Sequence, residues 1–200
     1  MLRNAEESRL VLVDYQERLM PVIQDGAAVL ANARRLAQVA KMVQVPVWGT
    51  EQNPQRLGPN DAQLRALCDK TLAKMHFSAV ADGLAEWLAP PPAAPRGNAR
   101  SLPRHLQKSQ PVSSERPSIV VAGCEAHVCL LQTALELIEE EFEIWVVTDA
   151  CGSRTDRNRD AAFDRLAGAG AELVTTEMVA FEWLRSCEHP SFKDMLGLIK

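Results

Sequence analysis

Short apolar runs alternate with longer amphipathic segments along this chain, and that alternation most constrains the fold. Six runs have the length and composition of buried strands: Arg9 to Asp14, Val45 to Thr50, a weaker run from Thr71 to Met75, Ser118 to Gly123, Glu143 to Thr148 and Ala171 to Thr175. Apolar residues recur at helical spacing in the segments Ala27 to Val43, Val80 to Leu88, Val128 to Glu139 and Asp156 to Ala167. This order predicts an α/β fold, a doubly wound parallel sheet with helices on both faces.

The length of the chain favours a single domain. Its 200 residues, 46% of them hydrophobic, suffice for one large core and are few for two. Residues 89–117 interrupt the pattern, because they hold seven of the 12 prolines and several basic side chains. We interpret this segment as an insertion, and a solvated loop, a lid and an oligomer contact all stay open.

Charge and cysteine usage narrow the functional classes. The formal net charge of -4 gives no basic surface for nucleic acid. The first eight residues lack an apolar signal region, and no apolar run has the roughly 20 residues of a membrane span. Five scattered cysteines form no C-x-x-C pair, so reduced thiols are the simplest interpretation. We expect a cytoplasmic protein with neither a membrane nor a nucleic-acid partner.

Chemically coherent side chains follow three of the expected strands. Asp14 ends the first strand, Lys74 ends the third, and Cys129 opens the helix after Gly123. Ligands of open parallel sheets bind beyond the carboxyl ends of the strands, so these three side chains are expected to meet. The positive end of a helix dipole favours a thiolate, which makes Cys129 a candidate nucleophile. Each residue also has a structural alternative, since Cys129 can pack as a small hydrophobe, Asp14 can cap a loop and Lys74 can be solvated.

Several motifs resemble the isochorismatase-like cysteine hydrolases, which include nicotinamidases, carbamoyl amidohydrolases and ureidoacrylate or biuret hydrolases. The resemblance spans nearly the whole chain outside the insertion, and looks closest to the isochorismatase-domain-containing subgroup. The motifs that carry it are Leu12-Val-Asp-Tyr-Gln16, Thr50-Glu-Gln-Asn-Pro54, Leu57-Gly-Pro59, Lys74-Met-His-Phe-Ser78, Gly123-Cys-Glu-Ala-His-Val-Cys129, Thr148-Asp-Ala-Cys-Gly-Ser-Arg154 and His189-Pro-Ser-Phe-Lys193. It implies a Rossmann-like sheet with strand order 3-2-1-4-5-6 and a homo-oligomer, either a dimer or a tetramer.

The resemblance also implies roles for the site residues. Asp14 would be the general base and acid, Lys74 its electrostatic partner and Cys129 the nucleophile. A non-proline cis peptide would lie between Cys124 and Glu125, and the N–H groups of Glu125 or Ala126, with that of Cys129, would form an oxyanion hole. The substrate would be a small amide, ureide or carbamoyl compound, hydrolysed through a thioester without a cofactor.

Other positions near the motifs are candidates for substrate contact. They are Gln16, Phe77, Ser78 and His127. Core packing is the alternative for Phe77, and a structural role is the alternative for His127. Many nicotinamidases of this family bind a metal through an Asp-x-His element and a further His after the second strand, but this chain reads Gly49-Thr-Glu-Gln-Asn-Pro-Gln55 there, with no histidine. We therefore expect no metal site. Ala126 stands where many relatives carry threonine, so one hydroxyl is missing.

Three other functional classes are alternatives to a cysteine hydrolase. A binding or scaffold module that has lost activity stays open, although such a module has no evident need for all three site residues. A dinucleotide oxidoreductase lacks support, because no G-x-G-x-x-G follows the first strand. A serine hydrolase lacks the G-x-S-x-G motif.

Overall fold

A six-stranded parallel sheet forms the centre of the computed structural model, which describes residues 2–89 and 118–199. The strands are β1 (Ser8–Val13), β2 (Val47–Gln52), β3 (Lys70–Lys74), β4 (Ser118–Gly123), β5 (Ile144–Val147) and β6 (Glu172–Val174), in the order β3-β2-β1-β4-β5-β6. All five neighbouring pairs are parallel. The predicted fold class and strand order are therefore confirmed. The predicted insertion lies almost entirely outside the described residues.

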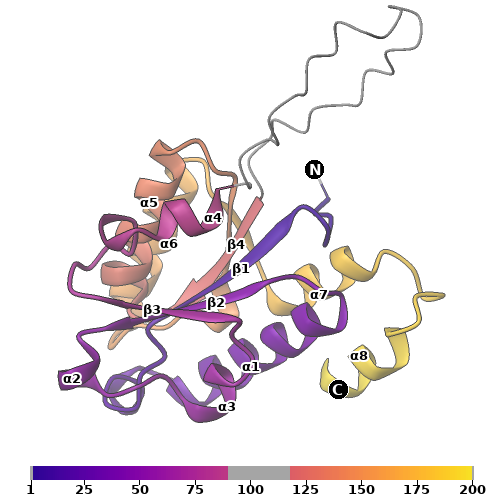
Figure 1. The fold of residues 1–200 in the computed structure, drawn as a ribbon, viewed down its shortest axis with the longest axis horizontal. Coiled ribbons are helices and arrows are strands. Elements are labelled where there is room, and N and C mark those ends of the chain that lie inside the picture. Colours follow the sequence, from indigo (N-terminus) through magenta and orange to yellow (C-terminus); the bar gives the residue numbers. More distant parts are fainter. Residues whose placement is uncertain (1, 90–117, 200) are drawn as a thin grey trace, which may run out of the picture.

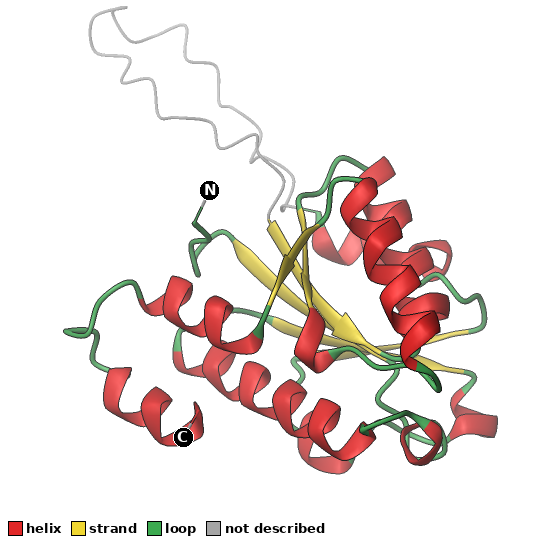
Figure 2. Ribbon diagram, turned by 180° about the vertical axis from the view of Figure 1, so that it is seen from behind, coloured by secondary structure: helices red, strands yellow, loops and turns green. Residues whose placement is uncertain are grey.

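Helices cover both faces of the sheet. On one face lie α1 (Gly26–Met42), α7 (Thr176–Leu184) and α8 (Phe192–Ile199), and on the other lie α4 (Leu84–Leu88), α5 (Leu131–Glu139) and α6 (Asp156–Gly168) (Figures 1 and 2). Two single-turn helices, α2 (Pro54–Leu57) and α3 (Ala62–Arg65), occupy the connection from β2 to β3. Because both faces are covered, every residue of β2 and β4 is buried, as the apolar sequence of β4 predicts, and β2 also buries the polar residues Thr50, Glu51 and Gln52.

Two predicted helices begin differently in the structure. The predicted helix from Val80 is divided into a 3-10 turn (η2, Val80–Asp82) and α4. The break lies at Gly83, whose φ of 96° is a conformation that glycine adopts readily. The helix after β4 starts with a π-helical turn, η5 (Ala126–Leu130), before α5. Cys129 therefore lies inside an irregular turn, a feature often found at functional sites.

The sheet order reverses between β1 and β4, which is where ligands of such folds bind. Val13 pairs with Gly123 at the carboxyl ends of these strands. A Cβ on Gly123 would lie 2.4 Å from the carbonyl oxygen of Val13, so only glycine permits this approach. Beyond this pair the chain turns away on both strands, and Asp14 adopts a left-handed φ of 54°. The end of β1 and the start of η5 thus flank one point.

Candidate active site

The Asp14 carboxylate is fully buried and held by the neighbouring strands. Its main-chain N–H donates to Thr50 O at 3.2 Å. Oδ1 accepts a 2.6 Å hydrogen bond from the Thr50 hydroxyl, and Oδ2 lies 2.8 Å from Lys74 Nζ. Asp14 and Lys74 both have side chains that are 0% exposed. A buried ion pair of this kind is expensive to desolvate, so the fold holds these charges at a definite place.

The Lys74 ammonium is surrounded by acceptors. It donates to Gln52 Oε1 at 2.7 Å and to the carbonyl oxygens of Phe77 at 3.0 Å and His76 at 3.3 Å, and it forms an ion pair with Asp14, whose Oδ2 has no hydrogen-bond partner within the described residues. These three acceptors match the three N–H groups of the ammonium, which leaves no donor free for a substrate oxygen in this arrangement. The Lys74 charge therefore lies beside the Asp14 carboxylate with its N–H groups bound within the cluster.

The Cys129 thiol is 6% exposed and belongs to the same cluster. Burial, the charge of Asp14 and a hydrogen bond with that carboxylate together raise its pKa from 9.0 to about 12, against a smaller lowering by the charge and hydrogen bond of Lys74. The expectation of a helix-stabilised thiolate is therefore wrong for the resting protein. Burial and the adjacent carboxylate both favour the neutral thiol. A neutral thiol beside an ionised carboxylate needs that carboxylate as a base before it attacks carbon.

Two residues of the cluster were missed by the sequence interpretation. Thr50 and Gln52 lie two apart on β2, so both side chains emerge on the same face at the end of the strand. Gln52 bridges the cluster, because its Oε1 accepts from Lys74 and lies 4.0 Å from Cys129 Sγ. The signal was two polar residues at the end of a strand adjacent to the first, but the predicted strand stopped at Thr50.

The peptide between Cys124 and Glu125 is cis, as the resemblance implies. The N–H of Ala126 donates to the carbonyl of Gly152 at 2.8 Å, so it is not free to bind an oxyanion. The N–H of Glu125 makes no hydrogen bond with the described part of the chain. Of the two N–H groups proposed beside that of Cys129, the geometry therefore favours Glu125.

Two of the predicted substrate contacts have their polar groups occupied by the protein. Gln16 Oε1 accepts from Gln52 N at 2.8 Å, while Nε2 donates to the carbonyls of Gln52 at 3.0 Å and Gly58 at 2.6 Å. Ser78 donates its hydroxyl proton to Glu136 at 2.5 Å. Both side chains are buried. These contacts make Gln16 a clamp on the end of β2 and Ser78 a link to α5.

The other two predicted contacts lie nearer the surface. Phe77 is 54% exposed, which excludes the alternative of core packing, and its main-chain carbonyl holds Lys74. The His127 ring is half-buried, with Nδ1 at 3.0 Å from Ser153 Oγ and Nε2 at 3.4 Å from Asn158 Nδ2. His127 therefore contacts the connection after β5 rather than Cys129. Within the described ranges, no three His, Cys, Asp or Glu side chains are arranged to hold a metal.

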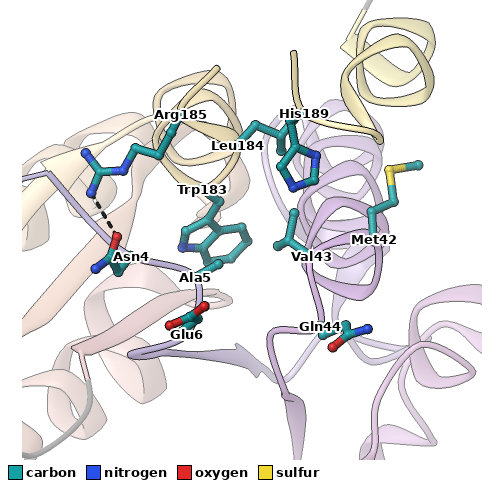
Figure 3. A pocket seen from close by; sticks show the side chains of 10 residues that line it. All are labelled: Asn4, Ala5, Glu6, Met42, Val43, Gln44, Trp183, Leu184, Arg185 and His189. Atoms are coloured by element: carbon teal, nitrogen blue, oxygen red, sulfur yellow. Dashed lines mark hydrogen bonds between the residues drawn. The ribbon is translucent and has the colours of Figure 1, made fainter. Parts of the chain in front are cut away.

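A separate pocket of about 470 Å³ lies at the opposite, amino edge of the sheet (Figure 3). It is formed by the segment before β1, the end of α1 and the end of α7, and its lining includes Glu6, Gln44, Trp183, Arg185 and His189. The pocket contains none of the predicted site residues.

None of the helices in the described chain is long and apolar enough to cross a membrane.

Comparisons with known proteins identify the family of this chain. Residues 101–178 match the isochorismatase domain model. Isochorismatase domain-containing protein 2A of Mus musculus is 33% identical over 195 residues, which cover 98% of this chain and 84% of that protein. The chain belongs to the isochorismatase family. The isochorismatase fold is shared with the structure of MAR1 ribonuclease from Caenorhabditis elegans, which has 27% identity, a TM-score of 0.82 and coverage of 100% of this chain and 92% of that one.

A further structure that resembles this chain is the YcaC gene product of Escherichia coli, which is described as an octameric hydrolase of unknown specificity. It has 23% identity and a TM-score of 0.75, and the match covers 100% of this chain and 95% of that chain. At this identity the likeness establishes the fold alone.

Proposed function

We propose that this chain hydrolyses a C–N bond of a small amide, ureide or carbamoyl compound through a thioester on Cys129. The observation that carries the proposal is the fully buried Asp14–Lys74 ion pair beside an almost buried thiol. Stability does not require such a pair, since apolar residues of similar volume often serve as well. Its presence next to a nucleophile supports catalysis over a binding module that has lost activity.

The first half-reaction starts from the neutral thiol. As Sγ bonds to the substrate carbonyl carbon, the Asp14 carboxylate takes the thiol proton, and the carbonyl π electrons move to oxygen. The N–H groups of Glu125 and Cys129 are the candidate donors to that oxyanion. Asp14 then gives its proton to the substrate nitrogen, the C–N bond breaks, and an amine or ammonia leaves. The charge of Lys74 stabilises the Asp14 carboxylate and the developing thiolate.

The second half-reaction releases the acyl group. Asp14 takes a proton from water as the water oxygen attacks the thioester carbon. The tetrahedral intermediate collapses, the C–S bond breaks, and the thiolate recovers its proton from Asp14. The products are an acid and the original resting site. All proton transfers use one carboxylate, and the step consumes no oxidant or cofactor.

The proposal includes an oligomeric state and a location in the cell. The E. coli relative is described as an octamer, which supports a homo-oligomer here, although the dimer or tetramer implied by the resemblance stays a prediction. All five cysteines are free, which supports the cytoplasm as the location of a thiol enzyme.

The C. elegans relative is named a ribonuclease, so RNA belongs in any substrate screen. The net charge of -4 favours a small molecule over a polyanion.

A substrate screen compares the wild-type chain with Cys129→Ser. Small amides, ureides and carbamates are assayed by release of ammonia or amine, with RNA cleavage measured in parallel. We expect turnover of a compound of the first group by wild type and a loss of at least about a hundredfold in the variant. Turnover that survives in Cys129→Ser would overturn the thioester route. Turnover of RNA alone would replace the substrate class.

A further inference from the structure

Gln52 is the last residue of β2, and β2 lies between β1 and β3, the other two strands that contribute to the cluster. It pairs with Lys74 in the sheet register, while its strand neighbour Thr50 pairs with Val13, the residue before Asp14. Gln52 is 9% exposed. Gln16 bonds both its N–H and its carbonyl, so the main chain here is fixed on both sides. The side chain therefore leaves a rigid base.

The orientation of the Gln52 amide follows from its two partners. Nε2 donates to the carbonyl oxygen of Met75 at 2.8 Å, and Oε1 accepts from Lys74 Nζ at 2.7 Å. Reversing the amide would set N–H groups against an ammonium and an oxygen against a carbonyl, so only one orientation satisfies both partners. The oxygen consequently faces the site, where it lies 4.0 Å from Cys129 Sγ.

We propose that Gln52 is a positioning residue that holds the Lys74 ammonium towards Asp14 and keeps the Cys129 thiol protonated until substrate binds. This inference rests on the proposed function, since it assigns the task to the same site. The amide oxygen takes up one N–H of Lys74, and the charge and hydrogen bond of this ammonium are what lower the pKa of Cys129, so Gln52 competes with the sulfur for Lys74. It also places a partial negative charge near Sγ, which disfavours a thiolate. The Cys129 proton is therefore transferred to Asp14 only when a substrate carbonyl is bound.

Two substitutions at this position change the charge near sulfur in opposite directions. Gln52→Met keeps the length of the side chain but removes the acceptor, so a Lys74 N–H becomes available to a thiolate. Gln52→Glu keeps the acceptor and the shape, loses the N–H donated to the Met75 carbonyl, and adds a negative charge. We expect alkylation of Cys129 at a fixed alkaline pH to become about tenfold faster in Gln52→Met and about tenfold slower in Gln52→Glu. These changes correspond to a shift of the apparent thiol pKa by about one unit, downwards in the first variant and upwards in the second.

The assay is iodoacetamide labelling of the folded chain across pH, followed by peptide mass spectrometry. The exposed Cys187 is an internal standard in every sample. Gln132→Met is the matched control, because Gln132 is exposed on α5 and outside the cluster. A purely structural role would loosen the site in both variants and move both rates upwards. Shifts in the same direction, or no shift, would overturn the inference.

The experiment separates this inference from the proposed function. Labelling needs no substrate, so opposite shifts would establish the role of Gln52 in the thiol's protonation even if the screen found no turnover. Conversely, turnover that requires Cys129 would stand if the two variants labelled like wild type. Gln52→Glu replaces an amide by an isosteric carboxyl group, so its predicted slowing tests the inference even if Gln52→Met fails to fold.

Discussion

The buried ion pair makes a quantitative prediction about stability. Asp14 and Lys74 are both 0% exposed, with 2.8 Å between Oδ2 and Nζ. Removing one partner leaves the other as an uncompensated charge in the interior, which costs about 3–5 kcal/mol. We expect Asp14→Asn and Lys74→Met each to lower the free energy of unfolding by that amount. For a chain of this size the melting temperature should fall by roughly 6–20 °C.

The double variant Asp14→Asn/Lys74→Met supplies the decisive comparison. Neither charge remains in it, so its loss of stability should be smaller than the sum of the single losses by at least about 2 kcal/mol. Urea unfolding of the four proteins at neutral pH measures this coupling. The half-exposed pair Lys41–Asp69 is the matched control, and its coupling should stay below about 1 kcal/mol. Additive losses for Asp14 and Lys74 would refute the interaction on which the site is built.

Two further predictions concern the buried groups. Burial raises the pKa of Cys129 and of Cys151 from 9.0 to about 12, so the stability that each thiol contributes is present below pH 9 and is lost as pH rises towards 12. Urea unfolding at increasing alkaline pH should show a loss of up to about 1.4 kcal/mol per pH unit for each thiol, and constant stability above pH 9 would contradict it. Thr50→Val removes the 2.6 Å hydrogen bond to the Asp14 carboxylate and should cost about 1.5–3 kcal/mol in the same assay. Thr50→Ser keeps the hydroxyl and should lose less, whereas equal losses would exclude the hydrogen bond as the cause.

Much of the fold was predictable because of burial. Strands covered on both faces read as continuous apolar runs, and the predicted run from Ser118 to Gly123 coincides with β4. Trp48 and Trp145 are buried, as their places in predicted strands indicate. The helices α7 and α8 were not predicted from the sequence.

The candidate active site was likewise predictable only in part. Asp14, Lys74 and Cys129 could be predicted to meet, because parallel strands deliver their carboxyl ends to one edge. Thr50 and Gln52 could not be recognised without the register, since a polar residue at a strand end is often solvated. The protonation of Cys129 also escaped prediction. A helix start considered alone favours a thiolate, but the outcome depends on burial and on a carboxylate from another strand.

A covalent intermediate on Cys129 is the most direct test of the account. Turnover of an amide or ureide substrate is quenched in acid, and the cysteine peptides are then analysed by mass spectrometry. The account predicts an acyl adduct on Cys129 alone, absent from Cys129→Ser and lost on mild alkaline treatment. An enzyme that turns over while Cys129 carries no adduct, or an adduct on another cysteine, would contradict it.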